Sequence, residues 1–120
     1  MFRENLSRMV DSVEGGVAGL LMGFDGIAVD SYWKDNAGGV NIENVGMEYS
    51  FILGQVKKAA ESLEVGGVNE LTIKAERLTT LIRVINDDYF VALAMTPEGN
   101  FGKGRYLMRV LAPKLQEELV

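Results

Sequence analysis

The chain of 120 residues contains neither cysteine nor histidine. Without cysteine it can form no disulfide and no catalytic thiolate. Histidine is the usual proton shuttle near neutral pH and a common metal ligand, so the usual zinc sites and the Ser-His and Cys-His nucleophile arrangements are also excluded. Carboxylates, lysine, tyrosine or serine could still support catalysis. These absences nevertheless favour a protein that is not an enzyme and that uses no cofactor or metal.

Long apolar runs and an excess of positive charge are missing as well. No run approaches the roughly 20 apolar residues that span a bilayer. The first residues, MFRENLSRMVDSV, carry acids and lack the uninterrupted apolar stretch of a secretory signal. A net charge of −5 argues against nucleic acid and anionic membranes as partners. We therefore expect a cytoplasmic protein that binds neither.

The composition is that of an ordinary globular protein, with 48% hydrophobic and 24% charged residues. A chain of this length can bury one core but is too short for two. We expect a single domain over residues 1–120.

Apolar periodicity predicts three helices and five strands. The helices are expected at 2–13, 41–63 and 101–119, with Pro113 kinking or breaking the last one. The expected core face of this last helix comprises Leu107, Val110, Leu111, Leu115 and Leu119. Asp25-Gly26 joins the first two strands as a hairpin, and the later separators are too short for parallel crossovers. The strands are expected at 17–24, 27–33, 68–75, 78–86 and 89–95.

The central strands VAGLLMGF, TTLIRVI and YFVALAM are apolar at both alternating sets of positions, which indicates cover on both faces. This predicts an α+β fold with one five-stranded antiparallel sheet, in the order α-β-β-α-β-β-β-α. The long middle helix would cover one face and the terminal helices the other. Strand 68–75 alternates and is expected at an edge, where it invites pairing with another chain unless Glu70 and Lys74 prevent it.

The long helix carries more apolar residues than one core-facing stripe needs. Met47 and Phe51 lie off this stripe, beside a row of small residues formed by Gly46, Ser50 and Gly54. Because a helical glycine costs about 1 kcal/mol relative to alanine, we interpret the row as a place where a partner helix approaches. Packing under the loop 34–40 is the alternative. The expected core stripe comprises Ile42, Val45, Tyr49, Ile52, Val56, Ala59 and Leu63.

Other motifs favour simple interpretations. The sequence GNFGKG at 99–104 lacks the Ser or Thr that follows lysine in a phosphate-binding loop. Asp25 and Asp30 fit turn chemistry better than an acid–base pair. Trp33 either caps the edge of the core or anchors a partner. Arg83, within an apolar strand, must emerge at an edge or pair with an acid.

Three segments together resemble the Roadblock/dynein light-chain family, and the resemblance covers essentially the whole chain. They are the hairpin GLLMGFDGIAVDSYW, the long middle helix, and the closing pattern TPEGNFGKGRYLMRVLAPKL. The resemblance is to bacterial MglB-type small-GTPase regulators within this family. None of the three segments is a catalytic signature.

The resemblance implies a homodimer formed by edge-strand pairing and packing of the middle helices. It also implies a platform for a Ras-like small GTPase, as a GAP-like activator or a scaffold, in cell polarity or motility. A small-ligand sensor with a pocket lined by Met22, Tyr89 and Met95 remains an alternative, as does a purely structural dimerisation module. The residues expected at the dimer or partner interface are Gly46, Met47, Ser50, Phe51, Gly54, Lys58, Glu70, Thr72 and Lys74.

Overall fold

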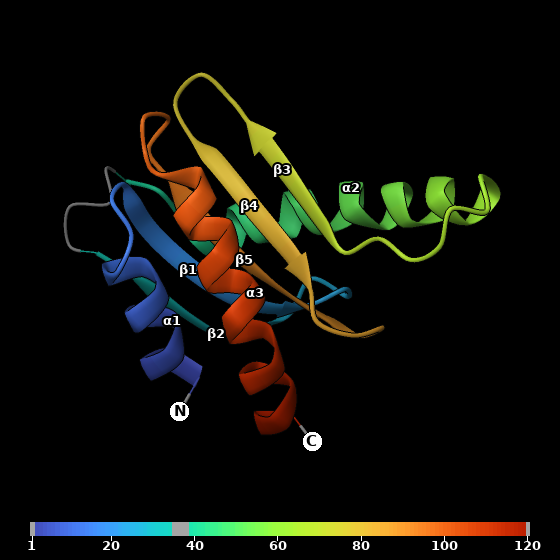
Figure 1. Cartoon of the computed structure of the whole chain (residues 1–120), viewed down its shortest axis with the longest axis horizontal. Helices are drawn as coiled ribbons and strands as arrows, with labels where there is room; N and C mark the ends of the chain where they lie inside the picture. Colours follow the sequence, from blue (N-terminus) through green and yellow to red (C-terminus); the bar gives the residue numbers. More distant parts are fainter. Residues whose placement is uncertain (1, 35–38, 120) are drawn as a thin grey trace.

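The computed structural model describes residues 2–34 and 39–119, so the expected loop 34–40 lies largely outside the described residues. Three helices flank one antiparallel sheet, in the predicted order α-β-β-α-β-β-β-α (Figure 1). The elements are α1 (Phe2–Asp11), β1 (Gly16–Gly23), β2 (Ala28–Trp33), α2 (Ile42–Ser62), β3 (Glu70–Lys74), β4 (Thr79–Val84), β5 (Tyr89–Met95) and α3 (Phe101–Glu118).

The five strands lie in the order β2-β1-β5-β4-β3, and every neighbouring pair is antiparallel. The two most apolar strands, β1 and β5, are therefore central, and β3 is at an edge as predicted. The connection from β2 to β3 is α2, so this helix crosses the sheet from one edge to the other.

Each face of the sheet has its own core, which confirms the prediction from the doubly apolar strands. On one face α1 and α3 lie side by side (Figure 1), and Leu6 and Leu115 pack with Leu21 and Leu93 of the sheet. On the other face, α2 contributes its buried residues to a cluster comprising Ala18, Leu20, Met22, Ile42, Leu53, Ile82, Phe90, Ala92 and Ala94.

Pro113 does not break α3, and one residue expected in the core face of this helix is exposed. The helix runs without a break through Pro113, which lies at an exposed position where water can satisfy the carbonyl that proline leaves unpaired. Val110 is not a core residue but is 44% exposed. Instead Gly104 and Met108 face the sheet, and a Cβ on Gly104 would lie 3.0 Å from Leu81 Cδ1.

The end of α2 is closed by two backbone hydrogen bonds. The Glu64 N–H donates to the Glu61 carbonyl (3.1 Å), and the Val65 N–H donates to the Ala60 carbonyl (3.2 Å). This is the pattern of a Schellman cap, which needs a left-handed residue just after the helix. Here that residue is Glu64, with φ of 56°, rather than the usual glycine.

Replacing Glu64 with glycine is expected to raise the free energy of unfolding by about 0.5–1 kcal/mol, because glycine adopts positive φ without the steric cost of a Cβ. Urea unfolding followed by circular dichroism measures the change. Gly66→Ala is the matched control, since Gly66 also has positive φ, of 90°, and alanine there should lower stability. A lower midpoint for Glu64→Gly would contradict the prediction.

Candidate functional site

Only the first half of α2 is seated on the sheet. The helix begins as predicted at Asn41, whose side-chain oxygen accepts a hydrogen bond from the Asn44 N–H (3.0 Å). Its buried residues are Ile42, Gly46, Ser50 and Leu53. Residues 54–62 are all described and none is buried. Figure 1 shows this second half projecting beyond the body of the molecule.

Gly46 and Ser50 do not form an outward row with Gly54, so this part of the prediction is wrong. A Cβ on Gly46 would lie 2.2 Å from Leu20 Cδ2, and Ser50 is only 8% exposed. The glycine is needed at 46 because α2 approaches its own sheet there. Gly54 differs, since a Cβ at that position would meet no atom within 4 Å.

Met47 and Phe51 lie one turn apart on the outer side of α2. Their exposed fractions are 55% and 71%. The described residues therefore do not cover them, and among these residues nothing prevents contact of both side chains with another molecule.

The second half of the expected core stripe is also exposed. Ile52 is 42% exposed and Leu63 is 71% exposed, and Ala59 between them is exposed too. The stripe is apolar as predicted. Its second half is exposed because α2 extends past the sheet, where the described part of the chain provides no surface for it to pack against. Exposed apolar patches rimmed by polar residues are typical of interaction sites. We call the residues Met47, Phe51, Ile52, Leu63 and Val65 the α2 apolar surface.

This exposure was missed at the sequence level, although the length of the helix carried the signal. A helix of 21 residues is about 31 Å long. A sheet of five strands, spaced by about 4.8 Å, is roughly 20 Å wide. A helix that crosses from one edge to the other must therefore overrun the sheet.

The second part of the candidate site is the β3 edge. β3 pairs with β4 on one side, and no described strand pairs with its other side. Lys74 Nζ lies 4.1 Å from the centre of the Phe101 ring in α3, and Glu70 also contacts α3. These two charged side chains are thus engaged on the α3 face. Thr72, between them, is exposed, as is Lys58 on α2.

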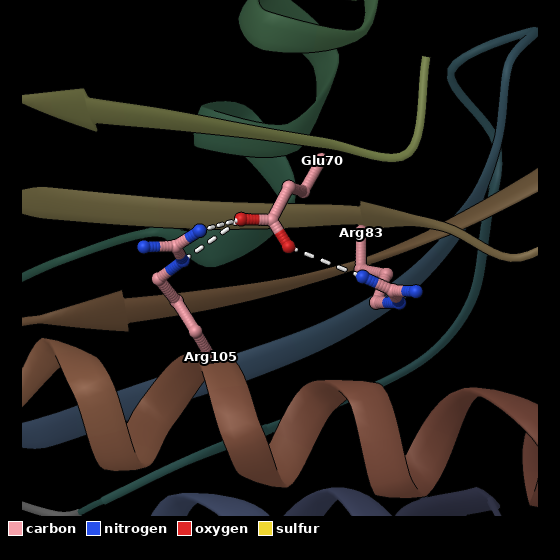
Figure 2. A network of polar contacts seen from close by, with 3 residues as sticks. All are labelled: Glu70, Arg83 and Arg105. Atoms are coloured by element: carbon pink, nitrogen blue, oxygen red, sulfur yellow. Dashed lines mark hydrogen bonds and ion pairs between the residues drawn. The ribbon is translucent and has the colours of Figure 1, made fainter. Parts of the chain in front are cut away.

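Figure 2 shows how Glu70 joins β3 to two other elements. One carboxylate oxygen accepts from Arg83 Nη1 in β4 (3.1 Å), and the other accepts from Arg105 Nε in α3 (2.8 Å) and from Arg105 Nη2. The side chain of Arg83 is only 23% exposed. Of the two alternatives expected for Arg83, the structure therefore shows pairing with an acid rather than emergence at a sheet edge.

Replacing Glu70 with glutamine is expected to lower the free energy of unfolding by about 1 kcal/mol, because partly buried Arg83 loses its carboxylate. Urea unfolding at low and high salt measures this effect. The difference from the wild type should shrink in high salt as the ion pair is screened. Glu76→Gln is the control, since Glu76 is exposed and forms no ion pair among the described residues. Equal losses for both variants would contradict the prediction.

The other singled-out residues have local roles. Asp25 Oδ1 accepts from the Ile27 N–H (3.0 Å), as expected of turn chemistry. Asp30 lies within β2 rather than in the turn, and its Oδ1 accepts from the Ser31 N–H (2.8 Å). Trp33 is 50% exposed, with the Arg3 guanidinium carbon 5.8 Å from its ring centre. Within residues 2–34 and 39–119, no cluster of three or more acidic, His or Cys residues could hold a metal ion.

The pocket expected for a ligand sensor is not formed. Met22 and Met95 are completely buried, and they belong to the cores on opposite faces of the sheet. They therefore cannot line one cavity with Tyr89. None of the described helices is long and apolar enough to cross a lipid bilayer.

No family model and no curated protein matches the chain. Among solved structures, MglC from Myxococcus xanthus shares 44% identity, with a TM-score of 0.71 and coverage of 98% of both chains. A Roadblock/LC7 domain from Streptomyces avermitilis has a TM-score of 0.85 at 14% identity, over 98% of this chain and 96% of that one. The gliding protein MglB from Thermus thermophilus has a TM-score of 0.84 at 14% identity, over 95% and 84%.

The last two likenesses show the fold alone, whereas the identity with MglC extends over nearly the whole sequence. On both grounds, the chain belongs to the Roadblock/LC7 family.

Proposed function

We propose that this protein is a homodimeric, non-catalytic regulator that binds a Ras-like small GTPase. The observation that carries the proposal is the α2 apolar surface, which its own chain leaves uncovered beside an unpaired sheet edge. Burying exposed apolar side chains such as Phe51 and Leu63 would favour association by about 1.5–3 kcal/mol each. A second copy of the chain can cover them.

The topology supports a particular dimer interface, which we call the seam. Because α2 crosses the sheet toward the β3 edge and runs beyond it (Figure 1), its second half would lie over the sheet of a copy that pairs along β3. A twofold axis at this edge would bring each α2 onto the other. The seam comprises Met47, Phe51, Gly54, Lys58, Glu70, Thr72 and Lys74. Gly46 and Ser50 face their own sheet and are not part of it.

The GTPase partner is proposed from family membership. Its relative MglC and the gliding protein MglB share this fold, and the resemblance implies GTPase platforms built from paired middle helices. The two α2 helices would contact the switch regions and shift their populations. The chain would act in the cytoplasm, in polarity or motility. As the family resemblance implies, activation would come from positioning the GTPase's own residues.

Three measurements test this proposal. Light scattering at micromolar concentration should give the mass of a dimer, and a monomer would contradict the seam. Calorimetric titration with a Ras-like GTPase encoded beside this gene, loaded with GDP or a GTP analogue, should show nucleotide-dependent binding. Faster GTP hydrolysis would identify an activator, and binding without faster hydrolysis a scaffold. No binding in either nucleotide state would contradict the GTPase proposal.

A further inference from the structure

A groove runs between α1 and α3, on the face of the sheet opposite α2. The two helices are antiparallel, because contacts join the start of one to the end of the other. Asn5 Nδ2 donates to Glu118 Oε1 (2.5 Å) at one end of the pair, and the Asn100 N–H donates to the Glu14 carbonyl (3.0 Å) near the other. Between these contacts the helices leave a cavity of about 140 Å³.

The middle of this groove is apolar. Met9 and Leu111 form part of its lining and are only 3% and 7% exposed, with Leu107 beside them. Val110 also lines it and is 44% exposed. Cavities of this size in other proteins admit a benzene ring. The groove can therefore accept an apolar side chain from another molecule.

The rims of the groove are basic. Arg8 of α1 and Lys114 of α3 line it, and neither forms an ion pair within the described residues. Residues 101–116 contain four cations and no carboxylate, in a chain whose net charge is −5. Arg105 among them is engaged by Glu70, and Arg109 lies 6.0 Å from the Tyr106 ring centre.

The acidic groups near the groove are at its margins. Asp11 of α1 accepts hydrogen bonds from the Tyr32 hydroxyl (3.1 Å to each carboxylate oxygen). Glu118 is bound by Asn5, and Glu117 lies beside it at the end of α3. Glu4 is exposed on α1. Arg8 and Lys114 thus line the same groove from its two helices, together with the apolar Met9 and Leu111.

We propose that the α1/α3 groove binds an acidic amphipathic helix of a protein partner. An apolar side chain of that helix would enter between Met9 and Leu111, and its carboxylates would pair with Arg8 and Lys114. Helices that lie in apolar grooves present anchors at three- and four-residue spacing. Charge complementarity selects an acidic helix over others, since like charges across an interface are repelled. This surface is separate from α2 and from the proposed GTPase platform.

The test uses a fluorescein-labelled peptide of repeated Glu-Leu-Leu-Glu-Glu-Leu-Ala heptads and measures its fluorescence anisotropy with the full chain. We expect saturable binding that Arg8→Glu with Lys114→Glu weakens by about 10-fold or more. Lys34→Glu with Arg77→Glu changes the net charge equally, away from the groove, and should leave binding within about 2-fold. A peptide of the same composition with a scrambled apolar pattern should bind much more weakly.

Val110→Glu is a second test, because this exposed position tolerates a charge without loss of the fold. It should abolish binding, and circular dichroism checks that each variant is folded. In amide NMR spectra the peptide should change the chemical shifts of residues in α1 and α3 rather than those of residues in α2. The proposal is overturned if the wild type does not bind, if the control pair weakens binding equally, or if the shifts fall on α2. Binding to phosphatidylglycerol vesicles in place of the peptide would assign the groove to membranes and also overturn it.

Discussion

Replacing Phe51 with glutamate is expected to convert the proposed dimer into a monomer without unfolding the chain. Phe51 is 71% exposed, so the chain's own fold does not depend on it. Across a twofold axis the substitution would place two carboxylates near one another in a surface that otherwise excludes water. We expect dimerisation to weaken by about 100-fold, which corresponds to about 2.7 kcal/mol. Light scattering over a dilution series measures the change, and circular dichroism checks the fold.

Val110→Glu provides the matched control for this experiment. Val110 is 44% exposed and lies on α3, which covers the face of the sheet opposite α2. The same change of an exposed apolar residue to glutamate should leave the mass of the dimer unaltered. If Phe51→Glu also remained a dimer with an unchanged dissociation constant, the α2 apolar surface would not be part of the seam.

The second large effect concerns Gly46. Gly46→Val is expected to lower the free energy of unfolding by about 3 kcal/mol, because overpacked cores must distort to admit extra carbon atoms. The new Cβ would stand 2.2 Å from Leu20 Cδ2 and 3.0 Å from Met22 Sδ. Both neighbours are completely buried and have little room to move. Urea unfolding in the Phe51→Glu background measures this loss without a contribution from self-association.

Gly54→Val is the control in the same background, with the same substitution in the same helix. A Cβ there meets nothing within 4 Å, and valine favours a helix over glycine by a few tenths of a kcal/mol. We expect stability to stay within about 0.5 kcal/mol of the background. Equal losses at the two glycines would show that contact with the sheet does not determine the effect at Gly46.

The order of elements and the cover on both faces of the sheet could be predicted because they rest on local patterns. Strands that are apolar at both alternating sets of positions need cover on both faces, and Asn41 caps α2 by contacts within one turn. Arg83 was expected to find an acid because a charge in an apolar strand is costly to leave unpaired. The sequence did not name Glu70 as that acid, since the register of β3 against β4 was unknown.

The length of α2 that packs against the sheet could not be predicted from periodicity. A repeat of apolar residues defines a stripe on a helix but not where the surface beneath it ends. The stripe from Ile42 to Leu63 was therefore expected to be buried throughout, and its second half is not. Gly46 was misassigned for a related reason, because close approach to a partner helix and close approach to its own sheet both require the absence of a Cβ.

If a partner covers the overhang of α2 as proposed, the order of its last turns depends on the concentration of that partner. Residues 54–62 continue a helix that is already formed, but none of them is buried, so they open more readily than the half that is packed on the sheet. A bound partner adds its binding free energy to the stability of the segment that it covers. A cell that makes more of this chain than of its partners would thus leave the surplus copies open to proteolysis at this end. The supply of partners, rather than the rate of synthesis, would then set how much intact protein accumulates.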